Sequence, residues 1–203
     1  MKFEDVAAQV KGIPHTQPDK GRILYDTIIS RGYTDCLELG FACGAGSAYM
    51  AAALEQNGRG KLTSVDIEAA LQRKPRADQL LEKLGLSHRT DFIFHEISYT
   101  WFLMDAIEQG RQFDFCFLDG AHTWDVDGFA FLMVERILKP GGMIIFDDVD
   151  WTIARSPTMK DKPFPERVRQ TPAVRKVYEL LVKNTPSLKT YEKDGWAYAE
   201  KVK

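Results

Sequence analysis

The chain has 203 residues, of which 44% are hydrophobic and 28% charged, and its 27 basic and 29 acidic side chains give a net charge of −2 at pH 7. This length suits one globular domain with a full hydrophobic core, so we expect a single domain over residues 1–203. The balanced charge predicts neither a nucleic-acid partner nor an anionic membrane surface. The composition therefore favours a small-molecule ligand, and it leaves open whether the protein is a homo-oligomer.

Cysteine usage and the N-terminal segment bear on the compartment. Cys36 and Cys116 lie in apolar runs, and an odd number of cysteines is typical of buried thiols in a reducing compartment. Glu4 and Asp5 interrupt the segment where a secretory signal would have its apolar core. The longest uncharged stretch, residues 39–54, is shorter than the ~20 residues that cross a bilayer. We therefore expect a cytoplasmic protein without a membrane span.

Short apolar runs alternate with helical patterns from about residue 34 to residue 146, which is typical of βαβ units. The runs that we expect to be buried strands are Cys36–Leu39, Leu62–Val65, Phe92–Phe94, Phe113–Leu118 and Met143–Phe146. Helices are expected at Arg22–Ser30, Ala48–Leu54, Pro75–Leu84, Val126–Leu138 and from Thr171 onwards. Leu188–Glu192 and Trp196–Val202 have the pattern of a hairpin. The predicted fold class is α/β, a Rossmann-like, doubly wound, mostly parallel sheet with a C-terminal antiparallel hairpin.

Residues 151–170 are rich in proline and basic side chains and too irregular for a core element. We expect this segment to form a lid over a pocket, where its positive charge would favour an anionic or highly hydroxylated ligand. The alternative is a solvated connection that contacts no ligand.

Acidic side chains stand at or near the ends of the predicted strands. Glu38 lies on the first strand, and Asp66, Asp119 and the pair Asp147-Asp148 end the second, fourth and fifth. Ligands of open α/β sheets bind outside the carboxyl ends of the strands. A strand also ends at a polar residue for purely structural reasons, but the recurrence predicts that these acids converge on one crevice.

A glycine-rich loop, Glu38-Leu-Gly40-Phe-Ala-Cys-Gly44-Ala-Gly46-Ser47, joins the first strand to an alanine-rich helix. Glycines allow a sharp turn and a close approach to a ligand, and the free N–H groups of a helix start suit polar or anionic atoms. Asp66, at the end of the second strand, is placed to accept hydrogen bonds from a ribose. The loop therefore predicts a nucleotide-like cofactor, although its spacing is neither G-x-G-x-x-G nor that of a P-loop. The alternative is a turn needed only for packing.

At these residues the sequence resembles the class I S-adenosyl-L-methionine (SAM)-dependent methyltransferases. The spacing Glu38-x-Gly40-x-x-x-Gly44-x-x-Ser47 is most similar to that of the small O-methyltransferases of the caffeoyl-CoA type, with Ala42 in place of a glycine. The resemblance extends over residues 13–146. Residues 16–30 resemble the family's entrance segment, so residues 1–33 are expected to form N-terminal entrance helices.

The resemblance implies a SAM site. In it, Glu38 would hold the methionine end, Asp66 the ribose, Ile67 the adenine face and Ser98 the adenine edge. The other residues expected to line this site are Gly40, Phe41, Ala42, Gly44, Ser47 and Asp119.

A second motif, Asp119-Gly-Ala-His122 together with Asp147-Asp148, resembles the metal-dependent sugar O-methyltransferases of the macrocin group. The resemblance implies that Asp119, Asp147 and Asp148 hold a divalent ion, and carboxylate oxygens favour Mg²⁺. His122 would then be the general base that takes a proton from an acceptor hydroxyl. The expected activity is methyl transfer from SAM to a hydroxyl of a small polar or sugar-like acceptor.

Two other functions remain open from the sequence. An NAD-type dinucleotide-binding oxidoreductase would share the loop and Asp66, but it normally has G-x-G-x-x-G and a further substrate domain. A non-catalytic SAM-binding module would keep Glu38 and Asp66 and would have no use for His122 beside the acids of the fourth and fifth strands.

Overall fold

One seven-stranded sheet forms the centre of the protein, in a computed structural model that describes residues 1–202. The strands are β1 (Asp35–Leu39), β2 (Lys61–Ile67), β3 (Thr90–His95), β4 (Phe113–Leu118), β5 (Leu138–Phe146), β6 (Leu188–Lys193) and β7 (Trp196–Lys201). Their order is β3-β2-β1-β4-β5-β7-β6, with β1 to β5 parallel and β7 antiparallel to both of its neighbours. The predicted fold class, including the C-terminal hairpin, is confirmed.

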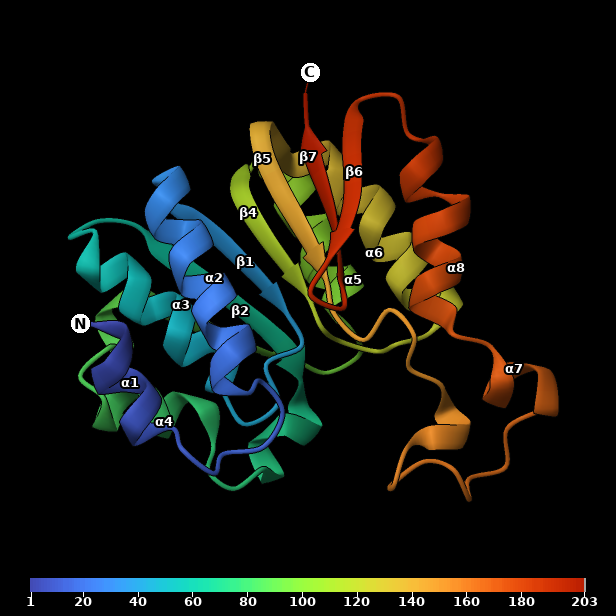
Figure 1. Cartoon of the computed structure of the whole chain (residues 1–203), viewed down its shortest axis with the longest axis horizontal. Coiled ribbons are helices and arrows are strands. Elements are labelled where there is room, and N and C mark those ends of the chain that lie inside the picture. The colour runs from blue at the N-terminus through green and yellow to red at the C-terminus, as the bar shows by residue number, and fades with distance from the viewer. Residues whose placement is uncertain (203) are drawn as a thin grey trace.

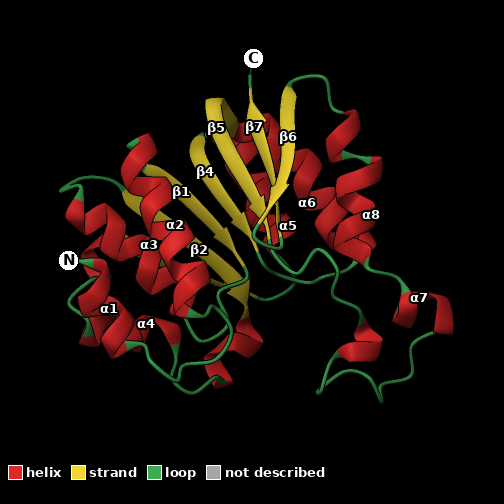
Figure 2. Ribbon diagram, in the orientation of Figure 1, coloured by secondary structure: helices red, strands yellow, loops and turns green. Residues whose placement is uncertain are grey.

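Helices cover both faces of the sheet (Figures 1 and 2). The first layer contains α1 (Phe3–Gln9), α2 (Pro18–Arg31), α3 (Ala45–Gln56) and α4 (Ala77–Lys83). The second contains α5 (Tyr99–Glu108), α6 (Trp124–Ile137) and α8 (Ala173–Leu180). The remaining helices are α7 (Glu166–Gln170), which projects to one side in Figure 1, and the short 3₁₀ turns η1 (Glu68–Gln72), η2 (Ser87–Arg89), η3 (Ile153–Arg155) and η4 (Val182–Asn184).

The alternation of side chains along β4 shows why both faces carry helices. Phe115 and Phe117 pack in the cluster formed with α1 to α4, whereas Cys116 and Leu118 pack in the cluster formed with α5, α6 and α8. Successive side chains of a strand point to opposite faces, so a strand that is apolar from Phe115 to Leu118 must be covered on both faces. Removing one such buried aromatic side chain costs about 3–5 kcal/mol.

Strand register brings the loops of the candidate site together. Leu39 of β1 pairs with Leu118 of β4, and Leu118 pairs with Phe146 of β5. The next residues remain hydrogen-bonded across the sheet, since the Asp119 N–H donates to the Leu39 carbonyl and the Asp147 N–H to the Leu118 carbonyl. The residues that follow β1, β4 and β5 therefore lie at one edge.

The predicted strands and helices are present, with ends shifted by a few residues, and three differences are larger. One is the short helix α7, which lies in segment 151–170, where no helix was predicted. Helix α5 was not predicted: Ser98 caps its N-terminus, and Phe102 and Leu103 pack its inner face. Strand β5 begins at Leu138 rather than at Met143, because the expected turn at 140–142 is an irregularity within the strand. Among residues 1–202, no helix combines the length and apolarity needed to cross a membrane.

Candidate active site

Asp119, His122 and Asp148 form a cluster at the carboxyl edge of the sheet. They come from the end of β4, the turn before α6 and the end of β5. The His122 Nε2 atom lies 3.8 Å from Asp119 Oδ1 and 3.5 Å from Asp148 Oδ2. One ligand atom of each residue lies within 4.8 Å of the others, and all three side chains are half-buried. This arrangement can coordinate a divalent metal ion.

Asp147 lies outside this cluster, in contrast to the sequence prediction that it would be a ligand beside Asp148. Its Oδ1 atom accepts hydrogen bonds from the Trp196 indole N–H and from the Asp148 backbone N–H. Strand β7 thus reaches into the site through Trp196, a residue that the sequence analysis did not select. The structure groups His122, instead of Asp147, with the two other aspartates.

The acids of this edge disfavour one another's ionisation. Burial raises the pKa of Asp119 well above its usual range, and the neighbouring charges of Asp147 and Asp148 raise it further. Burial and the charge of Asp147 also raise the pKa of Asp148. The His122 Nδ1 atom is buried and has no hydrogen-bond partner among residues 1–202. A bound cation would offset the repulsion between these carboxylates.

A buried pair, Tyr99 and Asp127, supports the turn that carries His122. The Tyr99 hydroxyl donates to Asp127 Oδ1 and accepts from the Ala121 N–H at 3.1 Å, while Asp127 Oδ2 accepts from the Thr123 N–H at 3.0 Å. The backbone groups on either side of His122 are thus held from within the core. Neither residue was predicted to belong to the site, and their separation of 28 residues gives no local signal.

Glu38 lies beneath the glycine-rich loop and is only 1% exposed. Its Oε2 atom accepts hydrogen bonds from the hydroxyls of Ser47 and Ser64. Burial raises the pKa of Glu38 to about 7, although both serines oppose this shift. The Glu38 carboxylate therefore joins Ser47 at the start of α3 to Ser64 of β2, and its expected role in holding the methionine end of SAM stays a prediction.

Asp66 holds the same loop from the other side. Its Oδ2 atom accepts from the N–H groups of Phe41 and Ala42, at 3.0 and 2.9 Å, and its Oδ1 atom accepts from Ile67 N–H at 2.7 Å. The Phe41 ring packs edge-on against two aromatic rings of β3. Ile67 is 43% exposed, so its side chain is free to contact a ligand.

Gly40 and Gly44 both have a left-handed backbone, with φ of 92° and 84°. A Cβ atom on Gly40 would lie 2.3 Å from the Asp119 carbonyl oxygen, and one on Gly44 would lie 2.7 Å from the Ala77 Cβ. The close approach that requires these glycines is therefore to neighbouring protein atoms. The Ser98 side chain also contacts protein atoms, since its hydroxyl accepts a hydrogen bond from the Thr100 N–H at 3.1 Å and caps α5.

A cavity of about 1030 Å³ opens beside His122. Residues 121–126, segment 151–170 and α8 form its walls, and the lining residues are Ala121, His122, Thr123, Trp124, Asp125, Val126, Ile153, Phe164, Arg167, Val168, Thr171, Ala173, Lys176 and Leu180. Trp151, which precedes this wall, places its ring centroid 5.2 Å from that of His122. His122 is the one residue of the acidic cluster that also lines the cavity.

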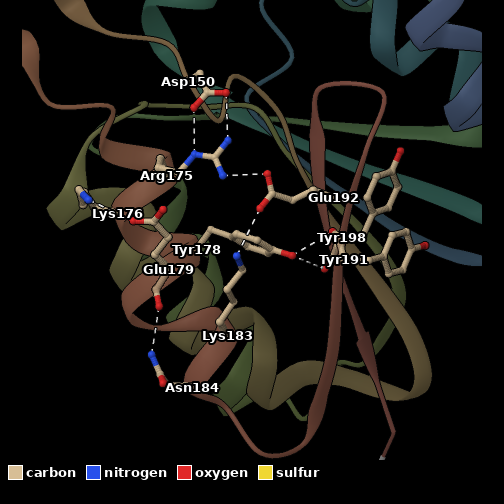
Figure 3. Close-up of polar contacts among 10 residues, drawn as sticks. All are labelled: Asp150, Arg175, Lys176, Tyr178, Glu179, Lys183, Asn184, Tyr191, Glu192 and Tyr198. Carbon is tan, nitrogen blue, oxygen red and sulfur yellow. Dashed lines mark hydrogen bonds and ion pairs between the residues drawn. The ribbon is translucent and has the colours of Figure 1, made fainter.

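Arg175 of α8 forms the hydrogen bonds that connect the two ends of segment 151–170 (Figure 3). Its guanidinium donates to both carboxylate oxygens of Asp150 at 2.9 Å and to Glu192 of β6 at 2.8 Å. These bonds lower the pKa of Asp150. Asp150 precedes the segment and Arg175 follows it, so the two ends of the segment are held together.

Comparisons with known proteins agree with this architecture. A putative caffeoyl-CoA O-methyltransferase from Staphylococcus aureus is 22% identical, with a TM-score of 0.72 over 99% of this chain and 92% of that chain. The O-methyltransferase from Bacillus cereus, in complex with SAH, is 19% identical, with a TM-score of 0.69 over 98% and 90%. The O-methyltransferase TomG from Streptomyces achromogenes, involved in tomaymycin synthesis and in complex with SAM, is 17% identical, with a TM-score of 0.68 over 99% and 89%.

No curated protein matches the chain in sequence. The family described as a methyltransferase domain matches residues 37–149, from the first strand to the acidic pair after β5. This match decides against the NAD-type oxidoreductase. Because it covers more than half of the chain, the protein belongs to the methyltransferase-domain family, and its similarity to the solved O-methyltransferases over nearly the whole chain shows that it has the class I SAM-dependent methyltransferase fold.

Proposed function

We propose that this protein is an O-methyltransferase that transfers the methyl group of SAM to a hydroxyl of a small-molecule acceptor, assisted by a divalent cation. One observation carries the proposal: His122 belongs both to the acidic cluster and to the wall of the cavity. An acceptor in that cavity would present its hydroxyl to an imidazole and to a cation site together.

The loop after β1 fits SAM. Gly44 caps α3 without a side-chain hydrogen bond, so the first N–H groups of this helix are free to meet the carboxylate of the methionine moiety. Asp66 lies beside them and can accept hydrogen bonds from ribose hydroxyls, since each carboxylate oxygen accepts more than one. The solved relatives bound to SAM and SAH support this assignment.

The acidic cluster fits a divalent cation. Two carboxylates with raised pKa values and a buried imidazole nitrogen without a partner form a donor set that is incomplete on its own. We assign Asp119 and Asp148 as the residues that would hold the ion, and the oxygen donors favour Mg²⁺. Asp147, which the sequence analysis included, instead anchors the turn after β5 through Trp196.

The chemistry divides between the bound groups and the chain. SAM supplies an electrophilic methyl group, and a divalent cation lowers the pKa of a hydroxyl that it contacts. His122 faces the acceptor and takes the hydroxyl proton at an imidazole nitrogen as the oxygen attacks the methyl carbon. The negative charges of Asp119 and Asp148 stabilise the resulting imidazolium. The walls of the cavity orient the acceptor and exclude water.

Two measurements test the proposal. SAM, SAH and NAD are compared by thermal shift: SAM and SAH should raise Tm, and NAD should not. A screen of catechols, glycosides and hydroxy acids for SAH release should then find an acceptor whose methylation stops in EDTA and returns with Mg²⁺. Methylation that proceeds undiminished in EDTA would remove the cation from the mechanism, and failure of SAM to bind would remove the activity.

A further inference from the structure

We propose that the acceptor combines an apolar body with an anionic group, and that Arg167, which lines the same cavity as His122 from a different element, recognises the anion. This inference rests on the proposed function, because it deepens the description of the same site. It differs from the sugar-like acceptor that the sequence resemblance implies.

The walls of the cavity are mostly apolar. Trp124 and Val126 at the start of α6, Phe164 and Val168 of segment 151–170, and Leu180 of α8 all contribute to the lining. Trp124, Val168 and Leu180 are large apolar side chains that remain 43–56% exposed, so they offer surface that an apolar ligand would bury. A sugar placed against these walls would leave most of its hydroxyls without hydrogen-bond partners, which is costly.

The charges along the walls are unequal. Arg167 and Lys176 are cationic, and Asp125 is the one acidic residue among those that line the cavity. Lys176 is already paired with Glu179 at 3.0 Å. Arg167, by contrast, has no carboxylate within 4.0 Å among residues 1–202. Its guanidinium is therefore the cation most available to a ligand, and it presents the fork geometry that binds carboxylate, sulfonate or phosphate oxygens.

Carboxylates and cationic side chains lie at different parts of the cavity wall. His122 lies at the edge of the sheet beside Asp119 and Asp148, whose carboxylates repel an anionic ligand group when no cation is bound to them. Arg167 lies on α7, the helix that projects to one side in Figure 1. A ligand with its anion at Arg167 can therefore place another group at His122, since both residues line the same cavity. The volume of about 1030 Å³ accommodates a body of ring size or larger between them.

The test uses two fluorescent probes with the same aromatic skeleton. Anilinonaphthalene sulfonate carries an anionic group, and N-phenylnaphthylamine does not. Fluorescence titration of the full chain, without SAM or metal, gives the affinity of each. We expect Arg167→Gln to weaken the sulfonate probe about three- to tenfold and to leave the neutral probe unchanged. Phe164→Ala should weaken both probes.

Arg155→Gln is the matched control, because Arg155 lies in the same segment but does not line this cavity; both probes should bind it as they bind the wild type. Equal loss of the sulfonate probe in Arg155→Gln and Arg167→Gln would overturn the assignment, because it would indicate non-specific charge attraction. Binding that is unaffected by Phe164→Ala would also overturn it. These titrations use no methyl transfer, so they can fail while SAM binds normally, or succeed while SAM does not bind.

Discussion

His122 and Asp148 share a left-handed backbone conformation that is uncommon for residues other than glycine: their φ angles are 53° and 51°. Such residues cost about 1–3 kcal/mol each and persist where the surrounding structure fixes them. Here two buried contacts do so. The pair Tyr99–Asp127 holds the turn at His122, and the contact between Asp147 and Trp196 holds the turn at Asp148. The positions of the reactive groups therefore depend on residues that need not touch a substrate.

The first prediction concerns Tyr99. Tyr99→Phe removes the hydroxyl that joins Asp127 to the Ala121 N–H, so we expect a loss of about 1–3 kcal/mol in the free energy of unfolding. Because the turn at His122 is then released, kcat should fall while the KM for SAM stays close to that of the wild type. Chemical denaturation and steady-state kinetics measure the two effects.

Tyr178→Phe is a matched control for this variant. Tyr178 is also buried, and its hydroxyl donates to the Tyr191 carbonyl of β6 (Figure 3) and not to a group in the turn at His122. It should lose stability and keep its kcat. An equal loss of kcat in both variants would show that Tyr99 acts on stability alone.

The second prediction separates the adjacent aspartates. Asp148→Asn should weaken Mg²⁺ or Mn²⁺ binding at least about tenfold, since a carboxylate ligand is lost. Asp147→Asn should bind the ion nearly as well as the wild type, because the amide oxygen can still accept from Trp196. Isothermal titration calorimetry with each variant measures the difference. Equal losses would restore Asp147 as a ligand.

The two aspartates differ in a way that their sequence neighbours do not reveal, whereas the strand pattern of the fold is visible in the sequence. The fold could be predicted because strands such as β1 and β4 are short, largely apolar runs and the loop after β1 has a recognisable spacing. Which member of an acidic pair faces the crevice is decided by Trp196, which is 49 residues distant from Asp147 and approaches through an antiparallel strand. The Tyr99–Asp127 pair is hidden in the same way, because it joins the unpredicted α5 to α6.

The third prediction is a pH dependence at Glu38. Its pKa rises from an ordinary value of 4.5 to about 7 on folding, so the folded state holds this proton more tightly than the unfolded state. Ionisation of Glu38 therefore lowers the free energy of unfolding. This loss is absent below pH 4.5, grows as the pH rises and is complete above about pH 7, where it amounts to about 3 kcal/mol. Glu38→Gln cannot ionise and should lose less stability over this interval. Chemical denaturation at pH 4.5, 6 and 8 measures the free energy of unfolding of the wild type and of Glu38→Gln. The same change with pH in both proteins would contradict the prediction.

The fourth prediction concerns Asp66. Asp66→Ala should weaken SAM binding by about 1–3 kcal/mol, because ribose hydroxyls lose a charged acceptor and the N–H groups of Phe41 and Ala42 lose theirs. Calorimetry measures the affinity, and binding of Mg²⁺ at the other end of the site serves as the control. Unchanged SAM affinity would place the ribose elsewhere.

The fifth prediction decides the role of His122, whose imidazole lies close enough to Asp119 and Asp148 to be either a ligand or a base. Only His122 of this cluster also lines the cavity, which favours the base, because a base must reach the acceptor proton. On this assignment His122→Ala lowers kcat about 10²–10⁴-fold and leaves the affinities for SAM and Mg²⁺ within a few-fold of the wild type. A ligand would behave differently, since its removal would weaken the ion first, and excess Mg²⁺ would restore part of the rate. Titrating kcat with Mg²⁺ in the variant therefore separates the two roles: a low rate that no Mg²⁺ concentration restores assigns the proton transfer to His122.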